Sequence, residues 1–483
     1  MNYETLANLS SASGAAITEG EKALIDDLVF AFRHNYEKNV ERTNYYEDKT
    51  RVSFAGINIR ESIEADIRTD VGWCGKGVDL LAARSVFDGF TVNDEADNAL
   101  TSVMSECDFG AEYSRAVPSQ LIHGYGLWTV TRGGEGQPAV SIRYYNGLNS
   151  SAVWDYTMNR IEAALVIDGY ERVLNGASLI PSLCVVHTND SVLVFRKQKN
   201  ATSWAVERLA NNMGRPMAVP MVYRSNLKPL GKSRISKAAM RITDNMRREI
   251  FLMNIQSRKH SLPTKYITNA SDSLMEGMEK SAVYNDEMLV IGKDEDGETV
   301  TIGQLQAASP ENHIKVMDKL ANEIAAEFSL PVATFGVAGN GYTSSDALRA
   351  STDDIIMEAK QLNRDNGKAL KQVARMALAI LGNCSYDDVA DSVSVHWIDP
   401  AMPSAAQRAD ALVKQVSMMP WLADTDVILE QLDYDEPTRA RLMRQKADAQ
   451  AAQSLTAALM GAVGGTGQQA VETPQQAAQR AAE

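Results

Sequence analysis

Two long amphipathic helices on either side of a short β-segment constrain the fold of this chain more than any other feature. In residues 232–260 apolar side chains recur at spacings of four, three, four and seven, which places them on one helical face. In residues 309–330 they alternate at three and four, as in a heptad seam. The seams comprise Ile235, Ala239, Ile242, Met246 and Met253, and Ile314, Met317, Ala321, Ile324 and Phe328. Pro263 and Pro331 end the helices, because proline lacks the amide proton that a helix interior needs.

Between these helices the sequence predicts a β-hairpin. Residues 288–291 and 299–302 are rich in apolar and β-branched side chains, and a polar stretch flanked by glycines joins them. This stretch contains the run Asp294-Glu295-Asp296-Gly297-Glu298. An EF-hand calcium loop needs the frame D-x-[DN]-x-[DN]-G with a later glutamate, which is absent here. We therefore interpret the run as an exposed turn.

The N-terminal part of the chain mixes helices and strands. Thr18 and Glu21 form a capping box before an apolar stripe that ends at Tyr36, so a helix is expected there. A second, short helix is predicted around Val78 and should end in a turn at Gly89. From about residue 120 to 225, apolar and β-branched runs alternate with Gly, Asn and Asp, a pattern typical of strands. The strand segments are 127–131, 139–145, 163–167, 183–186 and 191–195. The fold class is therefore α+β.

The C-terminal part is predicted to be mainly helical. A glycine-rich loop covers residues 336–343, and a third long helix should span 344–381, with Gly382 directly after its end. Further helices are expected through about residue 460. The tail from Gly461 is rich in Gly, Ala and Gln, a composition typical of disorder.

Length and composition exclude several classes of protein. A chain of 483 residues suggests two or three structural units. It lacks an apolar run long enough for a membrane span, and its N-terminus lacks the pattern of a signal peptide. Its 4 cysteines and 6 histidines show no disulfide framework, zinc-site spacing or H-E-x-x-H motif. With no Walker or G-x-S-x-G motif either, we expect no metal, no cofactor and no enzymatic activity, in a protein made in a reducing cytoplasm.

Charge is distributed unevenly along the chain. The formal net charge is −14, so the overall field does not attract nucleic acid. Residues 232–260 are the exception, with eight bases against two acids. One charged face of this helix carries Arg234, Lys237, Arg241 and Arg248. These bases could contact DNA phosphates, form a solvated face, or pair with acids on a neighbouring helix such as Asp318, Glu323 or Glu327.

Several short stretches follow one another in an order that resembles a known family. They are Tyr45-Tyr46-Glu47-Asp48, Trp73 with Val78-Asp79 and Ala82-Ala83-Arg84, Asp88-Gly89-Phe90, Val219-Pro220-Met221-Val222-Tyr223-Arg224-Ser225-Asn226, Gly231-Lys232-Ser233-Arg234-Ile235, Leu330-Pro331-Val332-Ala333-Thr334-Phe335-Gly336, and Ser344-Ser345-Asp346-Ala347-Leu348. Together with the order of helices and strands, they resemble the portal proteins of tailed bacteriophages, in particular those of long-tailed phages of Gram-positive bacteria. The resemblance spans residues 20–450 and lies in the collinear series rather than in any single motif.

The resemblance implies a portal fold, with an α/β wing, a two-helix stem, a small clip containing the β-hairpin, a long wing helix and an α-helical crown. The implied map is wing 1–230, first stem helix 231–262, clip 263–308, second stem helix 309–330, tunnel loop 331–345, wing long helix and following segment 346–399, and crown with disordered tail 400–483. Within the tunnel loop, Gly339, Asn340, Gly341, Tyr342 and Thr343 would face DNA. The loop could otherwise be a plain flexible connector; it is not a P-loop, because no lysine follows Gly341.

Family members assemble as rings, usually of about twelve subunits, at one vertex of the virion capsid. The resemblance thus implies a homo-oligomeric ring that is assembled in the host cytoplasm and passes double-stranded DNA. Its implied protein partners are the terminase, then head-completion or adaptor proteins, and the major capsid and scaffolding proteins. The ATPase belongs to the terminase. The resemblance implies no contact with a membrane. The alternative is another virion structural or adaptor protein that has no DNA channel.

Overall fold

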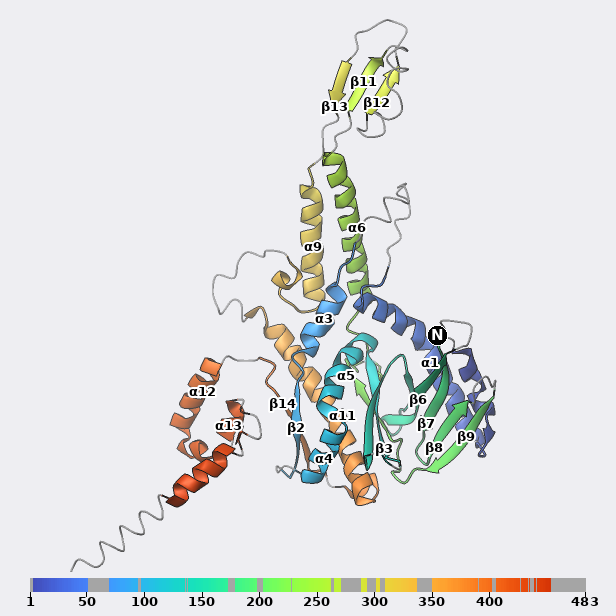
Figure 1. The fold of residues 1–483 in the computed structure, drawn as a ribbon, viewed down its shortest axis with the longest axis vertical. Helices are drawn as coiled ribbons and strands as arrows, with labels where there is room; N and C mark the ends of the chain where they lie inside the picture. The colour runs from blue at the N-terminus through green and yellow to red at the C-terminus, as the bar shows by residue number, and fades with distance from the viewer. Residues whose placement is uncertain are drawn as a thin grey trace, which may run out of the picture. The chain divides into compact units, whose positions relative to one another are not determined.

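The computed structural model describes residues 3–50, 69–93, 97–134, 136, 138–172, 179–197, 203–226, 228–261, 265–270, 288–292, 301–304, 309–336, 350–389, 391–401, 405–425, 427–432, 434, 438–439 and 441–452. The chain divides into two compact units, Met1–Pro400 and Ala401–Glu483. The first unit contains every sheet of the described part and the long helices drawn in Figure 1. The α+β class predicted from the sequence is confirmed.

The largest element of the first unit is a six-stranded sheet. Its strands, in spatial order, are β1 (Ser13–Gly14), β9 (Trp204–Ala210), β8 (Ser191–Lys197), β7 (Leu179–His187), β6 (Arg160–Arg172) and β5 (Ser150–Asp155). All neighbours are antiparallel except β1 and β9. The strands predicted at 163–167, 183–186 and 191–195 lie in β6, β7 and β8 and are confirmed.

One face of this sheet is covered by η1 (Glu4–Ser11) and α1 (Glu19–Tyr46). Leu28 and Phe32 of α1 pack in the same buried cluster as Leu165 of β6. The capping box predicted at the start of α1 is confirmed: the Thr18 amide donates to Glu21 Oε2 at 2.9 Å, and the Glu21 amide donates to Thr18 Oγ1 at 3.3 Å.

A second, three-stranded sheet packs on the opposite face of the first. Its order is β10 (Ala218–Val222), β3 (Tyr125–Arg132) and β4 (Val140–Asn146), all antiparallel. Leu127 and Ala218 share a buried cluster with Val166 of β6. Because neighbouring side chains of a strand point to opposite faces, Val166 faces this sheet while Leu165 faces α1.

Helices α3 (Trp73–Ala82), α4 (Asn98–Glu106), α5 (Phe109–His123) and α11 (Asp353–Gly382) enclose the main core together with the second sheet. Beside them β2 (Phe87–Val92) pairs with β14 (Val393–Trp397). Two predicted boundaries were wrong. Gly89 lies inside β2, because α3 already ends at Ala82. At the end of α11 the left-handed residue is Asn383, with φ 50°, and Gly382 is still helical.

The two amphipathic helices of the sequence are α6 (Lys237–Ser261) and α9 (Glu311–Glu327), which lie side by side (Figure 1). Helix α6 begins later than expected, because Ser236 Oγ accepts a hydrogen bond from the Ala239 amide at 3.0 Å and caps the first turn. Of the predicted seams, Ala239, Met246, Ala321 and Ile324 are buried. Ile314, in contrast, is 48% exposed, so the second seam is only partly covered within one chain.

The hairpin predicted between these helices was wrong. Strands β12 (Met288–Gly292) and β13 (Thr301–Gln304) do not pair with each other, and both pair with β11 (Lys265–Ala270). The β11–β12 pair is parallel and the β11–β13 pair is antiparallel. The sequence Lys265-Tyr266-Ile267-Thr268 alternates as a strand should, but it follows Pro263 so closely that the pattern is easily overlooked.

The C-terminal unit, taken by itself, is helical where it is described. It contains α12 (Ala405–Met418), η4 (Pro420–Asp424), α13 (Val427–Gln431) and a helical stretch at 441–452. The helical prediction is confirmed for these segments, and the tail predicted to be disordered lies outside the described residues. Across the described part of the chain, no helix is both long and apolar enough to cross a bilayer.

Candidate functional site

One buried arginine organises the end of the α6–α9 pair at which α6 begins and α9 ends, which we call the root of the pair. Arg234 lies just before α6 and is 3% exposed. Its guanidinium donates to the carbonyl oxygen of Gly77 at 2.9 Å, to the carbonyl oxygen of Phe328 at 2.7 Å and to the hydroxyl of Tyr223 at 3.0 Å. It also pairs with Glu358 Oε1 at 2.6 Å. One side chain therefore ties together α3, the end of α9, the segment after β10, and α11.

The carboxylate of Glu358 is the anionic partner in this cluster. Burial raises its pKa, but the adjacent Arg234 and hydrogen bonds outweigh that effect, so its pKa lies below the usual value. Oε1 accepts from the hydroxyl of Tyr223 and from Arg224 Nη2 at 2.7 Å. A charged pair with several hydrogen bonds offsets part of the cost of taking both ions out of water.

A second buried arginine fastens α6 to the end of α1. Arg247 is 1% exposed, pairs with Asp48 and with Asp244 at 3.4 Å, and donates to Thr50 Oγ1. Its guanidinium lies 5.6 Å from the centre of the Tyr45 ring, an arrangement that adds a cation–π attraction. The root of α6 is thus attached to the α/β body at two points along its length.

These contacts correct one prediction about the charged face of α6. Arg234 does not lie on that face, because the helix starts three residues later. The ion-pair partners also differ from those expected: Arg234 pairs with Glu358 of α11 instead of with an acid of α9. Of the expected partners, Glu323 pairs with Lys319 at 3.8 Å, and Glu327 accepts from Ser236 Oγ at 2.6 Å.

The remaining predicted bases, Lys237, Arg241 and Arg248, form an exposed stripe on α6. Their spacing of four and seven residues keeps them on one side of the helix. Arg248 donates to Asn245 Oδ1 at 3.1 Å, and no carboxylate of the described residues forms an ion pair with any of the three. We call Lys237, Arg241 and Arg248 the α6 basic stripe; it is available to a partner outside the chain.

Helices α6 and α9 are joined by a polar contact farther from their root. His313 Nδ1 of α9 lies 2.8 Å from Glu249 Oε2 of α6, and both side chains are largely buried. Ser309 Oγ, just before α9, accepts from the Glu311 amide at 3.3 Å.

The predicted tunnel-loop residues Gly339, Asn340, Gly341, Tyr342 and Thr343 lie outside the described residues. The segment before them is ordered by packing. η2 (Val332–Phe335) ends at Gly336, whose φ of 86° is in the left-handed region that glycine tolerates. Phe335 packs edge-on against Trp73 of α3, with ring centres 5.7 Å apart.

Among the described residues, no group of three or more His, Cys, Asp or Glu side chains lies close enough together to hold a metal ion. Cys74 is buried beside Thr243, and burial raises the pKa of its thiol to about 11. A thiol in that environment is a poor nucleophile.

Comparison with known proteins decides the family. The model for "Phage portal protein, SPP1 Gp6-like" matches residues 31–437, which is most of the chain. This chain belongs to the phage portal protein family. The portal protein of Mycobacterium phage L5 is 23% identical over 400 residues, covering 80% of this chain and 81% of that protein. The portal protein of Mycobacterium phage D29 is 24% identical with the same coverage. The resemblance noted in the sequence is thereby confirmed.

Two solved structures are similar to this portal-family chain at 13% sequence identity. The neck of an empty GTA particle, computed with C6 symmetry, has a TM-score of 0.41 and covers 76% of this chain and 91% of that chain. The neck of a native GTA particle, computed with C12 symmetry, has a TM-score of 0.37 and covers 78% and 94%.

Several of the portal-like stretches of the sequence meet around the root of α6 and α9. Tyr45 and Asp48 contact Arg247, Tyr223 contacts Arg234, and Trp73 contacts Phe335. Sequence reasoning had missed Glu358, Gly77 and Phe328 as partners of Arg234. No local pattern identifies these three residues, because each comes from a different part of the chain.

Close packing at this root gives a testable contrast between two helical glycines. A Cβ at Gly77 would lie 2.7 Å from ring atoms of the buried Phe328, whereas a Cβ at Gly110 of α5 would meet nothing within 4 Å. Alanine improves helix propensity by about 1 kcal/mol in a helix interior such as that around Gly77, and by less at Gly110, the second residue of α5. At Gly77 alone, overpacking costs about 1–3 kcal/mol. In urea unfolding, Gly77→Ala should therefore lower stability and Gly110→Ala should raise it. Two changes of equal sign and size would contradict this account of the packing.

Proposed function

We propose that this chain forms a ring-shaped channel at one capsid vertex, through which double-stranded DNA enters during packaging and leaves during ejection. Its membership of the phage portal family over residues 31–437 is the observation that carries the proposal. The role is structural: the ring guides DNA and supplies docking surfaces, first for terminase and then for head-completion or adaptor proteins. The major capsid protein and the scaffolding protein would be further partners, and assembly would take place in the host cytoplasm before the ring occupies a vertex of the virion capsid.

The arrangement of the described elements supports an assignment of each part of the chain to a region of the portal subunit. In this proposal α6 and α9 form the stem, the sheet β12-β11-β13 belongs to the clip at 263–308, and the α/β body with α11 forms the wing. The second compact unit, which begins at Ala401, would be the crown. Two buried arginines at the root of the stem would keep it rigid relative to the body while DNA passes.

Contact with DNA is assigned to few positions. The net charge of −14 per subunit repels phosphates, so a moving duplex would stay near the channel axis. The α6 basic stripe is the exposed exception, and a ring would repeat it once per subunit. The loop residues Gly339 to Thr343 would add neutral hydrogen-bonding groups and backbone freedom. Both assignments keep DNA contacts weak, as translocation requires.

Electron microscopy of the purified protein tests the proposal. We expect rings with a central hole wide enough for a DNA duplex. Solid particles or monomers under assembly conditions would instead favour a virion or adaptor protein without a channel. In phage assembly, deletion of residues 338–342 should impair packaging or retention of DNA; normal packaging would remove the tunnel-loop assignment.

A salt titration tests the α6 basic stripe. Replacing Lys237, Arg241 and Arg248 with alanine should flatten the dependence of DNA binding on salt, by about one unit of slope for each phosphate that the protein no longer neutralises. A matched variant removes three exposed bases elsewhere, Lys49, Arg115 and Arg172. The stripe assignment fails if both variants change the slope equally or neither does.

A further inference from the structure

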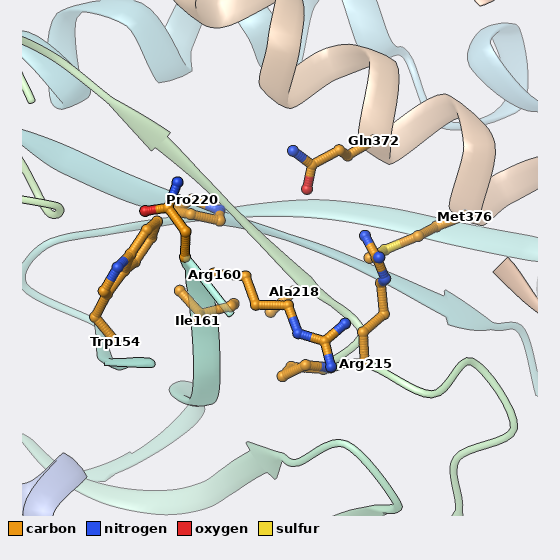
Figure 2. Close-up of a pocket in the computed structure, with 10 residues that line it drawn as sticks. Trp154, Arg160, Ile161, Arg215, Ala218, Pro220, Gln372 and Met376 are labelled. Atoms are coloured by element: carbon orange, nitrogen blue, oxygen red, sulfur yellow. The ribbon is translucent and has the colours of Figure 1, made fainter. Parts of the chain in front are cut away.

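A basic groove runs along α11 where this helix faces β10 and the start of β6. Figure 2 shows Gln372 and Met376 reaching from α11 toward Arg160, Arg215 and Trp154. Gln372 lines three adjoining hollows, of which the largest has a volume of about 490 Å³. The hollow beside Trp154, Ile161 and Pro220 has apolar walls, and we call the three hollows together the α11 groove.

The rim of the α11 groove carries more bases than acids, although the protein as a whole is acidic. The lining contains six bases, Arg160, Arg215, Lys228, Lys368, Lys371 and Arg375, against the three acids Asp365, Asp387 and Asp391. The three acids pair with four of these bases: Asp387 lies 4.0 Å from Arg215, Asp365 lies 3.2 Å from Lys368, and Asp391 lies 3.0 Å from Lys371 and 3.5 Å from Arg375. The lining therefore keeps an excess of three positive charges. Arg215 and Arg375 both lie over the Tyr386 ring, at 3.6 and 4.3 Å from its centre, which fixes their guanidinium groups in place.

The edge of the groove also exposes large apolar side chains. In the turn between β5 and β6, Tyr156 is 79% and Met158 is 58% exposed, beside the lining residue Trp154. Trp, Tyr, Met and Arg are the side chains enriched at the centres of protein–protein interfaces. A DNA duplex fits this surface poorly, because the groove is concave and carries acids of its own. The groove therefore fits an acidic protein surface with an apolar anchor.

Such a surface lies on α1 of the same chain. Asp26, Asp27, Phe30, Glu37 and Glu41 fall on one helical face, and Phe30 at its centre is 72% exposed. The ring of His34 stacks on Phe30 with centres 6.1 Å apart, and the exposed bases Arg33 and Lys38 flank the face, which therefore keeps an excess of two acids when both bases are counted. Among the described residues, no base forms an ion pair with any of these four acids. We call this set the α1 acidic face. It is complementary to the α11 groove in charge and in its exposed aromatic side chain.

The two surfaces lie on opposite sides of the six-stranded sheet. Helix α1 covers the face that presents Leu165, whereas β10 and the groove beyond it lie on the face that presents Val166. A subunit therefore cannot fill its own groove with its own α1. Contacts between different surfaces of identical subunits are heterologous and produce a ring when the rotation closes.

We propose that the α1 acidic face of one copy packs into the α11 groove of the next, with Phe30 between the rim side chains Trp154 and Tyr156. The inference rests on the proposed ring and names the surfaces that build it. The contact places acids of one subunit against bases of its neighbour at every interface of the ring. The same charges disfavour an isologous pairing of two acidic faces.

Cysteine crosslinking tests the contact in the full chain. The background replaces the two half-buried cysteines, Cys107 and Cys384, with serine. A chain carrying both Phe30→Cys and Tyr156→Cys should yield a ladder of covalent multimers with a short bis-maleimide. Chains with only one of these substitutions should yield no ladder, because each interface then offers a single thiol. Crosslinked dimers from Phe30→Cys alone would overturn the proposal in favour of an isologous contact.

Charge reversal supplies an independent test, read by electron microscopy and sedimentation. Asp26→Lys with Asp27→Lys, and separately Lys368→Glu with Lys371→Glu, should each reduce the fraction of subunits in rings by about tenfold or more. The chain that combines all four changes should recover assembly, since the charges again match. The control Asp88→Lys with Glu207→Lys reverses two exposed acids outside both surfaces and should assemble normally.

The outcomes separate this inference from the proposed function. If the unmodified chain forms no ring, the proposed function fails. If it forms rings that tolerate both reversals and give no crosslinked ladder, the channel stands and the α1–α11 contact is wrong. If only the groove reversal has an effect, and its effect is to abolish binding of another virion protein, the groove serves that protein and the proposal of a second copy is overturned.

Discussion

Replacement of Arg234 with methionine is expected to lower the free energy of unfolding by about 3–5 kcal/mol, the cost of breaking a buried ion pair by removing one partner. The change leaves the Glu358 carboxylate largely buried without its main counter-ion. It also removes the donors to the carbonyl oxygens of Gly77 and Phe328. Methionine fills a similar volume, so the loss of stability reflects charge and hydrogen bonding more than a cavity.

Urea unfolding followed by tryptophan fluorescence measures this effect. Arg248→Met is the matched control, because Arg248 is exposed on α6 and should change stability by less than about 0.5 kcal/mol. Arg234→Lys should fall between the two, since lysine keeps the charge but cannot reproduce the planar fork of donors. A destabilisation below about 1 kcal/mol for Arg234→Met would contradict the assignment of Arg234 as the link between α6, α9 and α11.

The pair Arg234 and Glu358 can be examined further by a double-mutant cycle. Glu358→Gln keeps the shape of the side chain and removes its charge. Because both single changes break the same interaction, the double variant should be more stable than the sum of the two single effects predicts, by about 0.5–3 kcal/mol. Strict additivity would mean that the two residues act separately.

Local signals in the sequence predicted the elements that depend on neighbouring residues. The capping box at Thr18 and Glu21, the strands at 127–131 and 139–145, and the seam residues Ala239 and Ala321 are present as expected. Each is set by residues close in sequence or by helical periodicity, which reports the face that a helix buries. The strand β11 was missed because its alternating pattern is short.

The candidate site was harder to predict, since helical periodicity says which residues share a face but not what covers that face. Arg234 fits the periodicity of α6 and yet lies before its first turn, buried against four other segments. Its partner Glu358 comes from α11, and nothing near either residue in the sequence marks the pair. Lys237, Arg241 and Arg248 followed the expected pattern, because exposed residues of a helix are arranged by the helix alone.

The groove along α11 could not be predicted from the sequence for a similar reason. Trp154, Arg215 and Gln372 come from three separate parts of the chain and meet only after both sheets and α11 have packed. The composition gives a net charge of −14, which does not reveal that bases outnumber acids in the lining of the α11 groove. Surface charge therefore has to be assessed face by face when assembly is considered, and the whole-chain value describes only repulsion at long range.

Two buried histidines should make the folded chain sensitive to mild acid. His187 in β7 is 1% exposed, and burial lowers its pKa to about 4. Its Nδ1 has no hydrogen-bond partner among the described residues. In His123, at the end of α5, burial and the nearby Arg42 also lower the pKa to about 4. Both rings are therefore neutral in the folded chain at pH 7, as they are for the most part in the unfolded chain.

The sign of the effect follows from the two states. The unfolded chain takes up a proton at each histidine near its ordinary pKa of 6.5, whereas the folded chain resists protonation down to about pH 4. Stability is therefore full above pH 6.5 and falls as the pH is lowered from 6.5 toward 4, by about 3 kcal/mol for each histidine. Glu358, with its lowered pKa, contributes a further decrease in the same direction at lower pH.

Unfolding in urea at pH 7.0 and 4.5 tests this for His187→Leu. Leucine has no proton to take up, so the drop in unfolding free energy between the two values of pH should be about 2–3 kcal/mol smaller than in the unmodified chain. His34→Gln alters an exposed histidine of α1 and should leave the drop unchanged. An unchanged drop in His187→Leu would show that His187 is protonated in the folded chain, and that its burial does not hold the ring neutral.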